Sequence, residues 1–552
     1  MMSAQSEPQF AQLLRMPIVV REAILSAVLC LIGAALLTML TAPPDDASAH
    51  LYRALLVQRD AVLWDNLWYG GDYPLISYSL LVYLPQQVVG PTTLALISVV
   101  VSAALFAVLV IQRWGVGVVW GARAFGLLAL GPLFTGGYAY AVGAAAMLAC
   151  LLALQHHRVA IGALLGAITL GFSPLAFVFL GLILAAVALQ RRRLDPRTIV
   201  VAGWLGALVV VQVVIGWLFP SDGVYPFLFG HLMAVLAVSL LGVMVARQRP
   251  EARLIMWLMI LWAVASLLLF AIPTPIGDNL ARLRYFAFPI MAVAAGLVSW
   301  RPRVLVVLAL AVSFGYGAMP DLVDAVTRSD SRPTQPEFWQ PAVSFLKQNQ
   351  TPDYRVEVVQ TSGRWEAFWI PEAGFALVRG WYRQVDLAEN PLLYQKQITP
   401  REYEEWLRSR AVRYVLLPDT PLDSEGAAAE ANLLRSGRSG LRLVERRGAW
   451  QIFELADPSP LMTGPGTATI TLQGHDQLAG RADRAGLYLL RVRWMPYWNF
   501  AGVVDCVAPG QHGQTVLRVT GPGEFSLVAI ERPEVLLERT FAASAGGSCN
   551  AP

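Results

Sequence analysis

Residues 93–112 read TLALISVVVSAALFAVLVIQ, a run without a single charged side chain. A helix needs about 20 mostly apolar residues to cross the hydrocarbon core of a bilayer, so this run predicts a transmembrane helix. The composition agrees: of the 552 residues, 56% are hydrophobic and 14% are charged. An average soluble protein carries about 25% charged residues. The chain is therefore predicted to be an integral membrane protein.

Similar apolar runs recur from Arg21 to about Pro320, while charges are ordinarily frequent after Asp321. The runs predict an all-α membrane bundle of about eleven helices. The predicted helices are 22–41, 93–112, 117–134, 138–155, 159–172, 174–190, 198–219, 227–246, 254–272, 285–300 and 303–319. Two of them are short, and the pair around Pro174 is expected to be broken or tilted.

Basic clusters fall at every second junction between these runs. They are His156/His157/Arg158, Arg191/Arg192/Arg193/Arg197, Arg247/Arg249/Arg253 and Arg301/Arg303. The positive-inside rule then places the N-terminus, residues 1–21, in the cytoplasm. Because no small-residue cleavage site stands in the expected place, the first helix is predicted to stay attached. The loop 43–91 and everything after Met319 are predicted to be extracytoplasmic.

Within the first loop, Leu75 to Gly90 is apolar enough to suggest another span. Counting it as a span would break the alternation of basic clusters, so it is predicted to be an interfacial or re-entrant helix. The membrane domain is thus expected over 22–319, with 43–91 as its first extracytoplasmic loop.

The tail is expected to hold two further regions. Residues 336–348 and 399–410 read as amphipathic helices, the second with Thr399 as N-cap and Pro400 at its first position. With the strands expected between 355 and 455, they predict an α/β region over 320–456. Residues 457–552 hold turn-separated strands without helices, which is typical of a β-sandwich. Cys506 and Cys549 are able to form a disulfide there if the tail is outside the cytoplasm, although sequence alone fixes no geometry.

The net charge of +4 is small and confined to short loops, so no nucleic-acid partner is expected. The first candidate site is an acidic pair, Asp45 and Asp46, where the chain leaves the first helix. His50 lies four residues after Asp46, on the same face if the segment is helical. A carboxylate at the membrane interface suits a general base. The alternative is that Asp45 or Asp46 only caps the helix that follows.

A second constellation interleaves aromatic and hydrogen-bonding side chains, a combination that holds sugar rings but also forms interfacial belts. The candidate sugar- or acceptor-binding residues are Asp65, Asn66, Trp68, Tyr69, Asp72, Tyr73, Tyr78 and Tyr138. A third constellation has Asn279, Arg282 and Arg284 just before an outward helix start. Guanidinium groups there would bind either a phosphate in fork geometry or lipid head groups nonspecifically.

These motifs resemble those of the GT-C superfamily of membrane glycosyltransferases. The resemblance covers about 22–319 and rests on Asp46-x-x-x-His50, LWDNLWYGGDYP (63–74), GFSPLAF (171–177) and GDNLARL (277–283). Within the superfamily the chain is similar to an actinobacterial-type group and, more distantly, to YfhO-type proteins. The tail stretches 379–418 and 487–502 are also similar to that group, and YWNFAG to the closing β-sandwich of YfhO-type proteins.

The resemblance implies a GT-C-like fold and a polyprenyl-phosphate-linked sugar as donor, delivered to an extracytoplasmic glycan or glycolipid with inversion. It also implies that a first-loop carboxylate is the base. This chain has Asp45–Asp46 where several GT-C families have Asp–Glu, so the choice between the two stays open; Asp46 is favoured because His50 follows it by four residues. The chain departs from sugar-nucleotide enzymes in having neither their D-x-D motif nor their glycine loop, which is consistent with a lipid-linked donor.

Two other classes of function stay open. One is a transporter or flippase for a lipid-linked saccharide, which would place charges or repeated halves near the membrane midplane. The other is a non-catalytic membrane scaffold that binds polysaccharide. No metal site and no required cofactor are predicted; Asp45, Asp46 and His50 would form at most a loose divalent-cation site without a fourth ligand.

Overall fold

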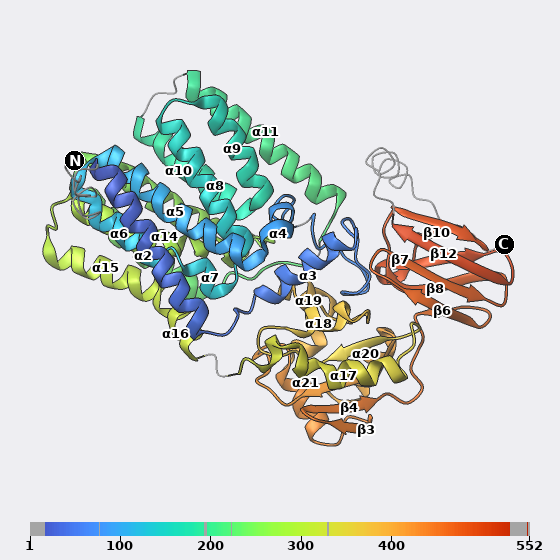
Figure 1. The fold of residues 1–552 in the computed structure, drawn as a ribbon. Helices are drawn as coiled ribbons and strands as arrows, with labels where there is room; N and C mark the ends of the chain where they lie inside the picture. The colour runs from blue at the N-terminus through green and yellow to red at the C-terminus, as the bar shows by residue number, and fades with distance from the viewer. Residues whose placement is uncertain are drawn as a thin grey trace, which may run out of the picture. The chain divides into compact units, whose positions relative to one another are not determined.

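The computed structural model describes residues 17–76, 78–191, 196–221, 223–327, 330–529 and 549. The chain forms two compact units (Figure 1). The helical unit consists of Met1–Pro44, Ser79–Val213 and Val224–Arg328, and the sheet unit of Asp45–Tyr78, Val214–Gly223 and Ser329–Pro552. Most of the first loop, predicted as part of the membrane domain, thus belongs to the same unit as the C-terminal part of the chain.

Ten segments of the described chain form helices long and apolar enough to cross a membrane, which confirms the helix-bundle prediction. The helices in these segments are α2 (Ile18–Leu40), α5 (Pro91–Trp114), α6 (Val119–Leu128) with α7 (Gly131–Thr135), α8 (Tyr138–Gln155), α10 (Pro174–Arg191), α11 (Pro196–Leu218), α12 (Phe229–Ala246), α13 (Arg253–Ala271), α14 (Arg284–Leu297) and α15 (Arg303–Gly317). The eleventh predicted helix is the short apolar α9 (Val159–Phe172). The protein is a multi-pass membrane protein.

Glycines let the helices of this unit approach one another closely. A Cβ atom on Gly126 of α6 would lie 2.7 Å from the backbone oxygen of Ser26 on α2. On the same helix, a Cβ atom on Gly121 would lie 2.9 Å from the backbone nitrogen of Val293 on α14. Small residues serve this purpose in membranes, where close van der Waals packing holds helices together.

Charged pairs link neighbouring helices of the described helical unit. Glu22, near the start of α2, accepts hydrogen bonds from Arg123, in the middle of α6, at 2.8 and 2.9 Å. His231, near the start of α12, contacts Asp278 at 2.5 Å. The predicted basic clusters fall at helix ends and in the segments between helices, except that Arg192 and Arg193 lie outside the described residues. Among the described residues of the segment 75–90, the one helix is the short α4 (Tyr83–Val89).

The sheet unit contains a mixed four-stranded sheet with the strand order β1-β2-β4-β3. Strands β1 (Arg355–Val358) and β2 (Val412–Pro418) are parallel, and β4 (Trp450–Glu454) runs antiparallel to β2 and to β3 (Arg442–Arg447). The helices of this region are α17 (Pro336–Asn349), α18 (Glu366–Glu372), α19 (Arg383–Glu389), α20 (Pro400–Ser409) and α21 (Ala428–Arg435). Thr399 caps α20 as predicted and forms a capping box with Glu402.

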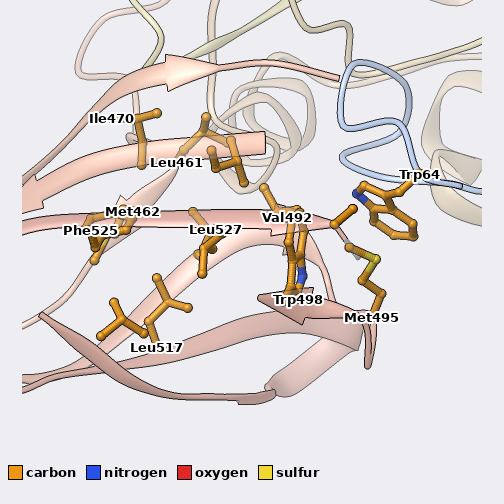
Figure 2. Packing of buried hydrophobic residues seen from close by; sticks show 14 of the residues in the cluster. Trp64, Leu461, Met462, Ile470, Val492, Met495, Trp498, Leu517, Phe525 and Leu527 are labelled. Carbon is orange, nitrogen blue, oxygen red and sulfur yellow. The ribbon is translucent and has the colours of Figure 1, made fainter. Parts of the chain in front are cut away.

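The last region of the sheet unit contains two antiparallel sheets of four strands, β10-β11-β8-β5 and β6-β7-β12-β9, as a sandwich requires. The strands are β5 (Met462–Thr463), β6 (Ala468–Gln473), β7 (Gln477–Ala482), β8 (Gly486–Arg493), β9 (Trp498–Gly502), β10 (Val504–Pro509), β11 (Gln514–Val519) and β12 (Gly523–Ala529). Figure 2 shows their core, into which the first loop inserts Trp64, with its ring centre 6.1 Å from that of Trp498. Cys506 and Cys549 form a disulfide, which settles the alternative left open by the sequence.

A buried charge cluster stands beside the mixed sheet. It consists of Arg379, Asp386, Glu357 and Glu430, all at most 3% exposed, and is called the Arg379 cluster below. Arg379 donates to Asp386 at 2.5 Å, and its Nη1 lies 3.7 Å from a carboxylate oxygen of Glu357 and of Glu430. Burial alone would raise the pKa of Asp386, but Arg379 lowers it overall. Burial and the neighbouring carboxylates raise the pKa of Glu357.

Candidate functional site

The predicted acidic pair stands where the chain passes from the helical unit to the sheet unit. Asp45 and Asp46 are half-buried and lie directly before α3 (Ala47–Gln58). The turn before α18 packs against them: Ser48 Oγ donates to the backbone oxygens of Asp45 and Gly363, both at 3.1 Å. Gly363 has φ +104°, and a Cβ atom there would lie 2.9 Å from Asp45 Oδ1. A glycine is therefore required beside the carboxylate.

Asp46 and His50 are one helical turn apart, as the spacing predicts. The His50 N–H donates to the Asp46 backbone oxygen at 3.4 Å. Asp46 occupies the N-cap position of the described helix, yet its side chain makes no capping hydrogen bond there. The His50 ring is 1% exposed and meets Tyr78 edge to face, with the ring centres 5.8 Å apart. His50 thus packs inside the sheet unit, while the neighbouring carboxylate stays half-buried.

Arg53, one turn after His50, is a residue that the sequence interpretation missed. It is fully buried, and its Nε donates to the Pro74 oxygen at 3.0 Å. Its guanidinium carbon lies 4.0 Å from the ring centre of Tyr78 and 4.8 Å from that of Tyr382. Such stacking stabilises a buried guanidinium by a cation–π interaction. The i, i+3 spacing from His50 was the available signal, because it places both side chains on one face of α3.

Asp65 and Asn66, predicted to bind sugar, attach the first loop to the turn between β6 and β7. Asp65 accepts from Tyr52 at 2.8 Å and contacts His475 Nδ1 at 2.9 Å. The Asn66 N–H donates to the His475 oxygen at 2.6 Å, and the Asn66 amide to the Gly474 oxygen at 3.2 Å. Both predicted residues are fully buried. These contacts give them a structural role in holding the loop.

Trp68 and Tyr69 pack against the segment before α19. Trp68 stacks on Tyr52 with ring centres 4.4 Å apart, and its Nε1 donates to the Ala367 oxygen at 2.9 Å. The Tyr69 hydroxyl donates to the Tyr382 oxygen at 2.8 Å. The two predicted rings are therefore fixed in position by hydrogen bonds at their polar ends.

Asp72 and Tyr73 stand beside the β-sandwich. Asp72 is fully buried, with a carboxylate oxygen 3.9 Å from Arg493 Nη1. Burial raises the pKa of Asp72 to about 6, although Arg493 opposes the shift. Tyr73 packs against Trp64 and Phe219 with ring centres 4.8 and 5.4 Å away.

The predicted phosphate-binding residues belong to the helical unit. Asn279 and Arg282 are half-buried in the 3₁₀ helix η3 (Gly277–Leu283). An Arg282 nitrogen would lie 3.6 Å from a Cβ atom on Gly137, the residue before Tyr138, so the structure brings Arg282 close to the start of α8. Arg284 donates to Asp321 at 2.6 Å, an internal ion pair that accounts for its charge.

Within the described part of the chain, no three His, Cys, Asp or Glu side chains form a group that could hold a metal ion. The chemistry proposed below uses side chains alone. Tyr138, the last predicted sugar-binding residue, is 4% exposed at the start of α8.

No family model matches the chain, and a search of curated proteins finds no match either. Among solved structures, the chain is similar to the arabinofuranosyltransferase AftD from Mycobacteria, with a TM-score of 0.47 and 13% identity. That similarity covers 92% of this chain and 57% of AftD. It is also similar to ArnT from Cupriavidus metallidurans bound to undecaprenyl phosphate, with a TM-score of 0.32 and 12% identity over 80% of this chain and 98% of ArnT. Both TM-scores lie below 0.5, and the function is therefore inferred from the residues of the chain itself.

Proposed function

We propose that the protein is an inverting membrane glycosyltransferase of the GT-C type. It would transfer a hexosyl or pentosyl group from a polyprenyl-phosphate-linked donor to an extracytoplasmic glycan or glycolipid. One observation carries the proposal: half-buried Asp45 and Asp46 stand at the head of α3, directly after the first apolar helix. A carboxylate at this point of the chain can meet a donor held in the membrane and an acceptor that approaches from water.

In the proposed reaction, Asp46 takes the proton from an acceptor hydroxyl. The hydroxyl oxygen attacks the anomeric carbon as the bond from that carbon to the phosphate oxygen breaks, and the lipid phosphate leaves with the electron pair. A single displacement of this kind inverts the configuration at the anomeric carbon. Asp46 is the proposed base because it is half-buried directly before α3 and His50 lies one helical turn after it. Asp45, whose Oδ1 faces Gly363, is the alternative base.

Arg282 is the proposed contact for the donor phosphate. It is half-buried in η3, directly before α14. A guanidinium group matches two phosphate oxygens at once, which suits an anionic lipid head group near a helix start. No metal ion is required by this scheme, and the lipid anchor accounts for the apolar helices around it.

The transporter alternative is less well supported by the arrangement of charges. In the described helical unit, the pairs His231–Asp278 and Arg284–Asp321 lie near helix starts, and only the pair Glu22–Arg123 has a member in the middle of a helix, Arg123 in α6. A transporter of a charged saccharide would ordinarily place such groups near the midplane.

A transfer assay tests the proposal. The full chain is reconstituted in lipid vesicles with a radiolabelled polyprenyl-phosphate sugar and a cell-envelope glycan fraction as acceptor. Glycosyl transfer should release polyprenyl phosphate and label the glycan. Movement of intact donor across the vesicle membrane without release would instead identify a transporter. Binding of glycan with neither transfer nor transport would identify a scaffold.

The orientation of the sheet unit is part of the proposal, since the acceptor is extracytoplasmic. Ser362 is exposed and stands next to Gly363, close to the acidic pair in sequence and structure. Ser362→Cys should react with a membrane-impermeant thiol reagent on intact cells, because Cys30 and Cys150 are buried and Cys506 is in a disulfide. Reaction only after lysis would place the unit in the cytoplasm and refute the proposed topology.

A further inference from the structure

The sheet unit contains a cavity of about 810 Å³ that none of the preceding chemistry uses. Residues from the first loop, the end of α11, the mixed-sheet region and the sandwich line it. Four arginines stand in its wall: Arg355, Arg410, Arg491 and Arg493. Glu389 is the one carboxylate among its described lining residues. The cavity therefore carries an excess of positive charge.

Arg355 lies deepest in this group of charges. It is 3% exposed and donates to two backbone oxygens, those of Arg410 and Arg491. No described carboxylate lies within ion-pair distance of its guanidinium group, and its Nε is buried without a hydrogen-bond partner among the described residues. Burial lowers the pKa of Arg355 to about 9, and the charges of Arg410 and Arg491 add to the effect. A buried charge of this kind is costly unless an anion joins it.

The three neighbouring arginines add further positive charge to the same wall. Arg491 donates to the Pro460 oxygen at 2.8 Å and to Thr463 Oγ1 at 3.1 Å, both neutral acceptors. Arg410 contacts Glu389 at 3.1 Å, the one lining carboxylate. Arg493 lies 3.9 Å from Asp72, which is a loose contact for an ion pair.

Aromatic rings stand in the same wall. Tyr69, Tyr73 and Tyr497 are buried lining residues, while Trp494 is half-buried and Trp217 is exposed at the end of α11. The hydroxyl of Tyr497 donates to the Leu218 oxygen at 3.2 Å, which fixes the ring. Flat apolar faces beside hydrogen-bonding groups accept the apolar faces of sugar rings.

We propose that this cavity binds an anionic saccharide, a sugar unit that carries a phosphate or carboxylate group. Its arginines would pair with the anionic group, and Trp494 and Trp217 would cover the ring. The volume of about 810 Å³ is large enough for a short oligosaccharide rather than a single ion. That this saccharide is part of the acceptor rests on the proposed function; the binding itself does not.

Isothermal titration of the full chain in detergent tests the inference with four probes: tetragalacturonate, glucose 1-phosphate, neutral maltotetraose and inorganic phosphate. At least one of the two anionic saccharides should bind about tenfold or more tightly than maltotetraose and than phosphate, and the affinity should fall with added salt. Binding of galacturonate or of the sugar phosphate tells which anion is recognised. The inference would be overturned if inorganic phosphate or maltotetraose bound as tightly as the anionic saccharides. It would also be overturned if none of the four probes bound.

Two variants and a control locate the binding. Arg491→Gln, which keeps a donor for Thr463, should lower the affinity for the anionic saccharide roughly tenfold or more. Trp494→Ala should lower the affinity for the saccharide but leave any weak binding of phosphate unchanged. Arg442→Gln, an exposed site on β3 outside the cavity, should leave binding unchanged. Unchanged affinity for the anionic saccharide in both folded cavity variants would refute the site. Asp46→Asn should still bind the anionic saccharide. This variant therefore separates loss of saccharide binding from failure of the proposed catalysis.

Discussion

The helical unit and the sheet unit differ in how many charged side chains they bury together. In the described helical unit, the buried Glu22 pairs with Arg123, whose side chain is 30% exposed. In the sheet unit, the Arg379 cluster lies in the interior, with Arg379 3% exposed and Asp386 fully buried. Charges near helix ends can reach the membrane interface, whereas charges inside a folded core depend wholly on their partners.

This difference indicates which interactions hold each unit together. The helical unit is held by apolar surface and close glycine contacts, and it contains few charged pairs. In the sheet unit, charged groups such as Asp65, His475 and Arg53 hold the first loop in place through hydrogen bonds. These contacts also position the segment that bears the acidic pair. The loop is thus part of the folded sheet unit and not a flexible connection.

The largest effect is expected inside the Arg379 cluster. Arg379→Leu leaves the Asp386 carboxylate buried without its guanidinium partner, which should destabilise the sheet unit by about 3–5 kcal/mol. Thermal unfolding of the purified full chain measures the loss. Arg401→Leu is the matched control, because its pair with Glu405 is exposed to solvent and should contribute little to stability. Equal losses of stability in the two variants would mean that the buried pair contributes no more than the exposed pair.

A smaller effect is expected on donor binding in the helical unit. Arg282→Ala should weaken binding of the polyprenyl-phosphate sugar roughly tenfold to a hundredfold while the protein stays folded, because one charge-assisted contact contributes about 1.5–3 kcal/mol. Arg284→Ala should lower thermal stability instead, since it removes the partner of Asp321. Titration with the lipid-linked sugar measures the first effect. Unchanged donor affinity in Arg282→Ala would move the phosphate site elsewhere.

Glu366 provides a test by pH. It is 4% exposed and accepts from Thr361, and burial raises its pKa to about 7 despite that hydrogen bond. The folded protein thus holds the proton more tightly than the unfolded chain, so this contribution to stability is full below about pH 4 and is lost as the pH rises to about 7. Between pH 5 and pH 8 the loss should be about 2 kcal/mol.

In Glu366→Gln, this part of the pH dependence should disappear, so the variant should gain stability relative to the wild type as the pH rises. Unfolding temperatures at pH 5 and pH 8 for both proteins give the difference. A constant difference between the two proteins would show that Glu366 does not titrate in this range.

Much of the fold follows from the sequence because lipid imposes strong rules. Apolar runs had to be helices, and the helix bounds agree closely with the predicted runs, as for Tyr138–Gln155. In the tail, the Thr399 cap was also predictable from its local pattern. The bounds of strands such as β9 and β10 were not predicted, because Trp498–Gly502 and Val504–Pro509 show no regular alternation of buried and exposed residues.

The site was less predictable than the fold. The composition of the first loop favoured Asp65 and Asn66 as sugar ligands, whereas their hydrogen bonds go to Gly474 and His475, about four hundred residues away in sequence. The arginines of the cavity likewise come from three segments far apart in the chain, around Arg355, Arg410 and the end of β8, so no local motif predicts the cavity. The placement of Asp46 and His50 one helical turn apart was predictable, because a helical turn is a local property.

The most direct test of the account is glycosyl transfer by Asp46→Asn compared with Asp45→Asn in the reconstituted full chain. The asparagine keeps the shape of the side chain but has no proton-accepting carboxylate, so turnover of Asp46→Asn should fall by roughly a hundredfold to ten-thousandfold while donor binding survives. Asp45→Asn should keep substantially more activity. A fully active Asp46→Asn with an inactive Asp45→Asn would reassign the base to Asp45, and full activity in the double variant would contradict catalysis by the first-loop carboxylates.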